Sequence, residues 1–264
     1  MISHIGRSDI LMMTLDTLRY DVAQRLFDDG RTPNLASVLP RHGWQRRHSP
    51  ASFTYAAHHA FFAGFLPTPT SPGPHMRLYA SDFGGSETTG PQTFTFGEAT
   101  LPEALKARGY QTICIGGTGF FNPVNVLGRV LPELFEESHW SSEMSVVGRE
   151  SPIKQVDCAI RAIEKQTQKQ VFCFINFSAI HQPNWFFEQR EESVEGHDTV
   201  ESHGAALEAI DREIPRLLHC FRKRGGLFAM IFSDHGTAYG EQNYWGHRLG
   251  HPVVWEVPYA DFHW

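Results

Sequence analysis

A buried strand that stops on an acidic residue and a histidine is the clearest chemical feature of this chain. The apolar run from Leu227 to Phe232 is followed by Ser-Asp-His-Gly, which places Asp234 and His235 side by side at the strand end. Ligands and catalytic groups of open α/β sheets collect at the carboxyl ends of strands, because adjacent loops converge there. We therefore interpret Asp234 and His235 as metal ligands.

The end of a second predicted strand supplies another acidic residue that could bind the metal. The apolar run that follows Asp9 ends on Asp16, and its central residues are expected to form a first buried strand. Asp16 and Asp234 are then predicted to lie at the same edge of one sheet. Taken singly, each aspartate could equally cap a following helix. The two together, with the histidines described below, favour a metal site.

The segment HSPASFTYAAHHAFFAGFLP combines a hydroxyl group with histidines at the start of a helix predicted over residues 54–65. Unpaired N–H groups at a helix start favour an anion such as a transferred phosphoryl group. The Thr54 hydroxyl could bind a metal there and attack phosphorus or sulfur. His58 follows on the same helical face, where it could contact substrate oxygens or the leaving group. A simple helix cap is the alternative, and Ser49 or Ser52 could be the nucleophile instead.

Length and composition are consistent with one large core. The 264 residues are 41% hydrophobic and 20% charged, and we predict a single domain over residues 1–264. The net charge of −6 provides no basic footprint for nucleic acid or an anionic membrane. We therefore expect a small anionic ester as the substrate, drawn by local charges such as those of a metal ion.

The ends and cysteines of the chain bear on its location. MISHIGRSDI has no long apolar stretch behind a basic start, and no run of about 18 apolar residues occurs, so we expect a cytoplasmic protein. The four cysteines show no CxxC spacing and are expected to be reduced, mainly core residues: Cys114, Cys158, Cys173 and Cys220.

Apolar strands alternate with helices along the chain. Further strands are predicted over residues 111–116 and 171–177, and one long helix over residues 202–223 is expected to kink at Pro215. This alternation predicts an α/β fold with a mainly parallel central sheet and helices on both faces. Residues 68–99, rich in Pro, Gly, Ser and Thr, are predicted to form a loop or lid.

Five segments, in the same order, resemble the sulfatase-like branch of the alkaline phosphatase superfamily: DILMMTLDTLRYD, TPNLASVLP, SFTYAAHHAFFAGFLP, FINFSAIHQPNW and FSDHG. The resemblance runs from about Ile10 to Pro258. It implies a doubly covered α/β sheet and a metal-bound nucleophile for phosphoryl or sulfuryl transfer. Because relatives continue beyond the position of Trp264, most of their C-terminal subdomain is expected to be missing. TYAAHHAFFAGFLPTP, GGSETTGP and SDHGTAYGE also look like a narrower group of short, stand-alone bacterial hydrolases found near radical-SAM genes.

The resemblance also implies roles for single residues. Asp16 matches the first-strand ligand, Thr54 the nucleophile position, and Asp234 with His235 the late ligand pair. Formylglycine sulfatases carry Cys or Ser at the position of Thr54, and threonine cannot become the aldehyde hydrate that they use. A metal site with an imidazole and fewer carboxylates favours zinc or manganese over calcium.

The same resemblance places three histidines toward the substrate. His58 falls where these families have an Arg or His, His181 matches a substrate-contacting histidine, and His247 matches a residue that reaches the transferred group. Protonated forms of these side chains are expected to add donors and to widen a preference for phosphate as the pH falls toward 6. We expect one metal ion; a second would have His181, His247 and His251 as its evident candidate ligands.

Four further residues are candidates for substrate binding. Arg19, just after the first strand, could clamp an anion or pair with Asp21. Trp245 could wall a pocket or belong to the core, and His251 could serve the site or the local structure. His59 is the fourth candidate.

These residues together predict a metal-dependent hydrolase or transferase that acts on a phosphate ester, phosphodiester or phosphonate through Thr54. Two alternatives stay open. One is a sulfate ester hydrolase, and the other is a non-catalytic binding or scaffold protein that keeps the fold and serves a partner enzyme in its pathway. The sequence leaves a homo-oligomer open.

Overall fold

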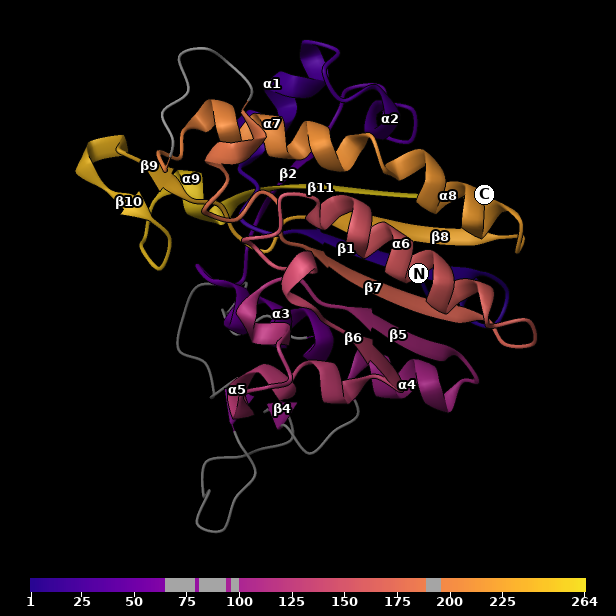
Figure 1. Ribbon diagram of the computed structural model, residues 1–264. Coiled ribbons are helices and arrows are strands. Elements are labelled where there is room, and N and C mark those ends of the chain that lie inside the picture. The colour runs from indigo at the N-terminus through magenta and orange to yellow at the C-terminus, as the bar shows by residue number, and fades with distance from the viewer. Residues whose placement is uncertain (65–78, 81–93, 96–99, 189–195) are drawn as a thin grey trace, which may run out of the picture.

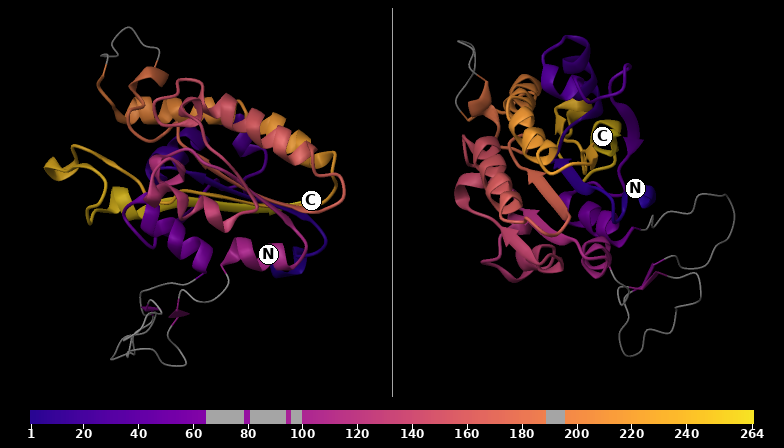
Figure 2. Two further views of the ribbon diagram at one scale, coloured as in Figure 1. Left: turned by 60° about the horizontal axis from the view of Figure 1, so that its bottom comes forward. Right: turned by 90° about the vertical axis from the view of Figure 1, so that its right-hand side faces the viewer.

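A seven-stranded sheet with helices on both faces forms the centre of the computed structural model (Figures 1 and 2). The structure describes residues 1–64, 79–80, 94–95, 100–188 and 196–264, so that most of the loop or lid predicted at 68–99 lies outside the described residues. The strand order is β2-β11-β8-β1-β7-β5-β6. These strands are β1 (Asp9–Leu15), β2 (Gln45–His48), β5 (Gln111–Ile115), β6 (Glu137–His139), β7 (Val171–Phe177), β8 (Leu227–Phe232) and β11 (Glu256–His263).

Helices cover the two faces unequally. The helices are α1 (Tyr20–Asp28), α2 (Pro33–Ala36), α3 (Thr54–Ala63), α4 (Leu101–Ala107), α5 (Val126–Arg129), α6 (Ser151–Glu164), α7 (Val200–Asp211), α8 (Ile214–Arg222) and α9 (Pro252–Trp255). Figure 1 shows α1, α6, α7 and α8 above the sheet and α3 and α4 below it, and the end-on view in Figure 2 shows the sheet between these two layers. Two small ladders, β3 (Tyr79–Ala80) with β4 (Phe94–Thr95) and β9 (Ala238–Tyr239) with β10 (Trp245–Gly246), complete the strands.

Alternating side chains of the central strands divide the core into two clusters. In β1, Leu11 and Met13 belong to the cluster under α6 to α8, whereas Ile10 and Met12 belong to the cluster with Phe62 of α3. Successive side chains of a strand point to opposite faces, so every second residue of β1 faces α3. This parity decides which polar residues at the strand ends can meet α3.

The parallel register brings three strand ends to one edge. β1 pairs in parallel with β7 on one side and with β8 on the other. In Figure 1 the carboxyl ends of these strands lie at the left, beside α3 and β9. The α/β fold with a mainly parallel sheet is therefore confirmed.

Two details differ from the sequence prediction. The predicted helix over residues 202–223 is wrong as one element, because α7 ends at Asp211 and α8 begins at Ile214 with Pro215 in its first turn, where the missing N–H costs nothing. The antiparallel strand β11, next to β8, escaped prediction because it carries Pro258 and Asp261 within a mixed polar pattern.

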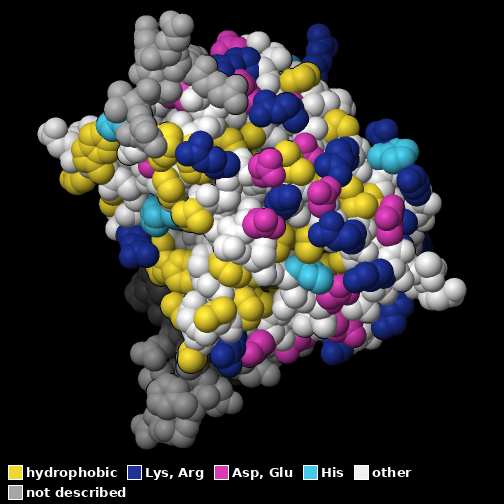
Figure 3. All heavy atoms as spheres, in the orientation of Figure 1, with side chains coloured by type: hydrophobic (Ala, Val, Ile, Leu, Met, Phe, Trp, Pro, Cys, Tyr) yellow, Lys and Arg dark blue, Asp and Glu magenta, His cyan; other side chains and the backbone are white. Residues whose placement is uncertain are grey.

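Other features follow local signals. Gly64 ends α3 with φ of 70°, a left-handed value that glycine adopts without steric cost. Thr100 and Glu103 form a capping box at the start of α4. Basic and acidic side chains are interspersed over the face that carries α6 and α8 (Figure 3). Within the described part of the chain, none of the helices combines the length and the apolar character that a bilayer crossing requires.

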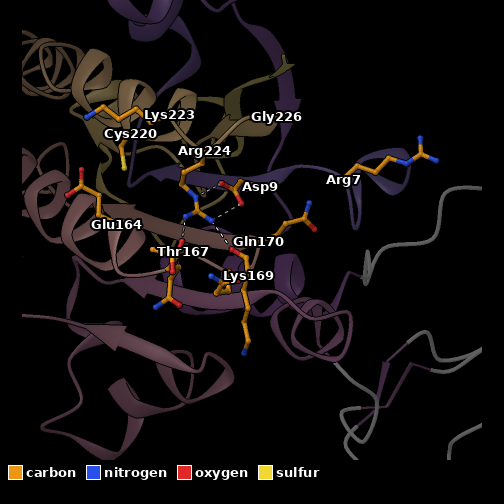
Figure 4. Close-up of a pocket in the computed structure, with 12 residues that line it drawn as sticks. Arg7, Asp9, Glu164, Thr167, Lys169, Gln170, Cys220, Lys223, Arg224 and Gly226 are labelled. Atoms are coloured by element: carbon orange, nitrogen blue, oxygen red, sulfur yellow. Dashed lines mark hydrogen bonds and ion pairs between the residues drawn. The ribbon is translucent and has the colours of Figure 1, made fainter.

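The amino ends of the strands are tied together by an ion pair. Arg224 Nε donates to Asp9 Oδ2 at 2.6 Å, and its Nη2 donates to the carbonyl oxygen of Lys169 at 2.8 Å. Asp9 Oδ1 accepts from Val171 N at 2.8 Å. Figure 4 shows the Arg224 guanidinium directed at the Asp9 carboxylate, within a cavity of about 530 Å³ at this edge. This group fixes where β1 and β7 begin.

Candidate active site

Three side chains from the ends of two strands converge at the carboxyl edge of the sheet. Asp16 follows β1 directly, and Asp234 and His235 follow β8. One ligand atom from each of them lies within 4.8 Å of the others, and all three residues are completely buried. Folding thus brings Asp16, near the start of the chain, beside Asp234 and His235, near its end.

Each of the two carboxylates has one bonded and one unpaired oxygen. Asp16 Oδ2 accepts from Asn176 Nδ2 at 2.8 Å, and Asp234 Oδ1 accepts from Thr17 N at 3.1 Å and from His235 N at 3.0 Å. Asp16 Oδ1 and Asp234 Oδ2 are buried and have no hydrogen-bond partner among the described residues. A buried carboxylate oxygen without a donor or cation is costly. These two oxygens are the donors that a cation would complete.

Burial changes the proton affinity of this pair. It raises the pKa of Asp16 to about 6, with a further contribution from the Asp234 charge. It raises the pKa of Asp234 to about 7. Both shifts follow from removing a negative charge from water, and a bound cation would reverse them.

The His235 ring is fixed in the tautomer that suits a metal ligand. Its Nδ1 lies 2.8 Å from the carbonyl oxygen of Gly236, which can only accept, so Nδ1 carries the proton. Nε2 therefore offers its lone pair beside Asp234 Oδ2, which lies 3.5 Å away. Gly236 allows this turn to pass close to α9, because a Cβ there would lie 1.9 Å from the carbonyl oxygen of Val253.

Thr54 lies at the same point. It is the first residue of α3 and only 1% exposed, and its Oγ1 is 3.3 Å from His235 Nε2. The competing nucleophile Ser49 is turned away, since its hydroxyl donates to backbone carbonyl oxygens, those of Ala51 and Asp234. Of these two hydroxyl groups, that of Thr54 is the one that contacts the His235 ring.

His58 lies beneath Thr54 and has no exposed surface. Its Nδ1 donates to the carbonyl oxygen of Thr54 at 2.7 Å, and its Nε2 accepts from the Thr14 hydroxyl at 3.1 Å. Rings of Phe121 and Phe174 enclose it. Burial lowers the pKa of His58 to about 3, so the ring is neutral and supports the start of α3.

His181 and His247 form the less buried side of the site. The His247 ring centroid is 4.7 Å from that of His235 and 5.5 Å from that of His181. His181 Nδ1 donates to the carbonyl oxygen of Gln182 at 2.6 Å, which leaves its Nε2 as an acceptor. Burial, and then the neighbouring histidines, lower the pKa of His247 to about 3. The prediction that protonated His58 and His247 supply donors near pH 6 is therefore wrong, because desolvation disfavours their charged forms.

The structure places the four predicted substrate-binding residues in other local contacts. Arg19 pairs with Asp21 at 2.6 Å and with Glu241. Trp245 is 61% exposed on β10. His251 accepts from Val253 N at 3.2 Å and caps α9, and His59 packs edge-on against Tyr55 with ring centroids 4.4 Å apart. Their roles toward a substrate remain predictions.

Sequence reasoning missed two polar residues that support the site. Thr14 of β1 and Asn176 of β7 are cross-strand neighbours, and Asn176 Nδ2 donates to Thr14 Oγ1 at 3.2 Å. Asn176 Oδ1 accepts from Thr118 N at 3.0 Å. The available signal was one amide inside the apolar run VFCFINF, because a buried polar group requires partners.

Comparisons with solved structures give a consistent fold. The chain is similar to the C-terminal periplasmic domain of phosphoethanolamine transferase EptC from Campylobacter jejuni, with 11% identity, a TM-score of 0.66, and coverage of 97% of this chain and 79% of that one. It is similar to lipoteichoic acid synthase LtaP from Listeria monocytogenes, with 13% identity, a TM-score of 0.63, and coverage of 96% and 65%. It is also similar to the periplasmic domain of EptC from Escherichia coli in complex with Zn, with 11% identity, a TM-score of 0.64, and coverage of 96% and 72%. At these identities the likeness establishes the fold alone.

A search of curated proteins found no match. The family described as Sulfatase matches residues 9–259, which include both strand ends and the start of α3. A further fold neighbour, from Vibrio parahaemolyticus, is a protein in the alkaline phosphatase superfamily, with 17% identity and a TM-score of 0.54. Because the match spans nearly the whole chain, this protein belongs to the sulfatase family.

Proposed function

We propose that this chain is a metal-dependent hydrolase or transferase of phosphate esters, phosphodiesters or phosphonates, with Thr54 as its nucleophile. The observation that carries the proposal is the pair of buried, unpaired carboxylate oxygens, Asp16 Oδ1 and Asp234 Oδ2, at the start of α3. Their arrangement beside His235 Nε2 is a donor set for a transition metal.

The residues present fit a single divalent cation. Asp16, Asp234 and His235 would hold it, with the Thr54 hydroxyl close by. The mixed oxygen and nitrogen donors favour zinc or manganese over calcium. The zinc complex of the fold neighbour from Escherichia coli supports zinc as the first metal to test. When bound, the cation supplies positive charge that stabilises an anionic transition state.

The chain itself contributes orientation. The His58 ring holds the carbonyl oxygen of Thr54, and Thr14 holds the ring, so the first turn of α3 is fixed relative to β1. The unpaired N–H groups of that turn favour the anionic group that Thr54 attacks. In this proposal His181 and His247, whose rings pack together on the less buried side, contact the leaving group or its oxygens.

The nucleophile favours phosphate over sulfate chemistry. Threonine cannot be converted to the formylglycine hydrate that many sulfatases use, and phosphoryl oxygens carry more negative charge than sulfuryl oxygens. A divalent cation therefore stabilises phosphoryl transfer more. Sulfate ester hydrolysis is the second candidate, which the family match favours.

Matched nitrophenyl phosphate, phosphodiester and sulfate esters would test the proposal with zinc-loaded and manganese-loaded protein. We expect phosphate turnover at least about tenfold faster than sulfate turnover, a difference of about 1.4 kcal/mol in transition-state stabilisation. Equal or faster sulfate cleavage would select the second candidate. Stoichiometric metal binding without turnover of any ester would instead support the non-catalytic scaffold.

A further inference from the structure

An exposed arginine lies at the less buried side of the candidate active site. Arg248 comes two residues after β10, directly behind His247. Its backbone N–H donates to the carbonyl oxygen of Ser52 at 2.9 Å, and its guanidinium carbon lies 5.8 Å from the centre of the Phe53 ring. Ser52 and Phe53 immediately precede Thr54, the first residue of α3. Arg248 is therefore anchored beside the proposed nucleophile.

The backbone of Arg248 adopts a conformation that residues with a side chain rarely take. Its φ is 68°, in the left-handed region, where the Cβ is crowded by the backbone. The hydrogen bond to Ser52 and the contact of the guanidinium with the Phe53 ring hold the residue in this conformation. Unfavourable backbone conformations that are maintained by neighbouring contacts are concentrated at functional sites.

The positive charge of Arg248 is available to a ligand. Among the described residues, no carboxylate forms an ion pair with its guanidinium. Arg19, by contrast, is paired with Asp21 and Glu241. Burial lowers the pKa of His235, and the positive charge of Arg248 acts in the same direction, so this charge is felt at the proposed metal ligands. An exposed cation in this position is suited to bind an anionic group.

We propose that Arg248 selects phosphoester substrates whose leaving group carries a second anionic group with paired oxygens. The inference rests on the proposed function, in which the buried Thr54 attacks and His247 lies toward the leaving group. Because Arg248 follows His247 and is exposed, its guanidinium meets the far part of the leaving group rather than the transferred phosphoryl group. A planar guanidinium binds such an oxyanion through two parallel N–H donors.

Two phosphonates that differ in one charge would test this assignment: para-carboxybenzylphosphonate and para-carbamoylbenzylphosphonate. Calorimetric titration of the zinc-loaded protein measures both dissociation constants without requiring turnover. We expect the carboxylate to bind at least about fivefold more tightly than the amide, and this ratio to fall toward one in Arg248→Gln. Equal affinities in the wild type would overturn the proposal. An Arg248→Gln variant that weakens both ligands equally would also overturn it, because the arginine would then contact the phosphonate group that they share.

Two further variants separate a specific contact from a general effect of charge. Arg248→Lys keeps the charge but loses the paired donors, so its ratio should lie between those of the wild type and Arg248→Gln. Arg222→Gln is the matched control, because Arg222 is also exposed and lies 5.0 Å from the ring of Trp264, at the amino edge of the sheet. Its ratio should equal that of the wild type.

Kinetics of the corresponding phosphate esters distinguish this inference from the proposed function. For para-carboxyphenyl phosphate, Arg248→Gln should raise KM at least about fivefold and change kcat less than about twofold, because the arginine binds a part of the substrate that does not react. Cleavage of this ester and of para-carbamoylphenyl phosphate without any preference would refute the inference and leave the proposed function intact. A binding preference in a protein that cleaves neither ester would support the Arg248 contact and argue against catalysis by Thr54.

Discussion

A buried aspartate lies at each end of the central strand β1, and the two carboxylates differ in their bonding partners. Asp9, at the amino end, is 5% exposed, and its two oxygens are bonded by Arg224 and by the Val171 amide. Asp16, at the carboxyl end, is completely buried and keeps one oxygen without a partner in the described part of the chain. The amino edge therefore holds the strands in place, whereas the carboxyl edge retains an uncompensated negative charge that suits a cation.

The largest expected effect concerns turnover at the carboxyl edge. Thr54→Ala should lower turnover of a nitrophenyl phosphate ester at least about a thousandfold, because it removes the attacking oxygen. Metal content should stay near that of the wild type, since the charged donors remain. Steady-state kinetics and metal analysis of the purified variant would measure both quantities.

Thr54→Ser is the matched control and should retain part of the activity because it keeps a hydroxyl. If Thr54→Ala turned over substrate at a rate near wild type, the nucleophile role would pass to Ser52 or to a bound water.

A substitution at the amino edge should change the stability of the fold rather than substrate turnover. Arg224→Met leaves the Asp9 carboxylate buried without its counter-charge, and we expect a loss of about 3 kcal/mol in the free energy of unfolding. Urea unfolding in the presence of chelator would measure this loss. The neighbouring exposed residue provides the control, Lys223→Met, which should change stability by less than about 0.5 kcal/mol. A matching loss in both variants would remove the distinction between the two edges.

Removing the negative charge at the carboxyl edge should weaken metal binding without destabilising the metal-free protein. Asp234→Asn should weaken zinc binding at least about a hundredfold, because it replaces a charged donor. In the metal-free protein at pH 8 the urea midpoint should stay equal or rise, since a buried, incompletely bonded carboxylate disappears. Chelator-competition titrations and urea unfolding would measure the two quantities. Undiminished zinc affinity in Asp234→Asn would argue against the metal site.

The smallest expected effect concerns the pH dependence of stability. It comes from His203, a buried histidine near the carboxyl edge whose two ring nitrogens both have hydrogen-bond partners. His203 Nε2 accepts from Arg19 N at 3.3 Å, its Nδ1 lies 3.1 Å from the Tyr239 hydroxyl, and burial lowers its pKa to about 3. Because this folded-state pKa lies below the unfolded value of about 6.5, the unfolded chain binds the proton first. The stabilisation is complete above about pH 6.5 and is lost as the pH falls toward 3.

His203→Gln should therefore flatten the dependence of unfolding free energy on pH between 6.5 and 4.5 by roughly 1 kcal/mol per pH unit. Urea unfolding at several pH values, with chelator present, would measure the slope. The exposed His219 offers the control His219→Gln, for which the wild-type slope should be kept. Parallel slopes for wild type and His203→Gln would contradict the assignment.

Local sequence signals were sufficient for the central strands. The apolar runs that predicted β1, β7 and β8 end where the strands end, because a continuous run of buried residues bounded by polar residues has few other solutions. The edge strand β6 and the antiparallel strand β11 could not be found in this way. Their polar residues face solvent or a neighbour, and pairing with another strand, rather than local pattern, makes them extended.

In the candidate site, too, some features followed from local sequence and others only from the tertiary structure. Residue type and position after a strand or at a helix start were enough to select Asp16, Thr54, Asp234 and His235 as candidates. Only the tertiary structure decided that Asn176 supports Asp16 and that His58 turns inward beneath Thr54. It likewise paired Arg19 with Glu241, 222 positions away. The physical reason is that the local sequence determines on which strand end or helix start a side chain lies. Its hydrogen-bond partners and its access to water depend on other segments that folding brings beside it.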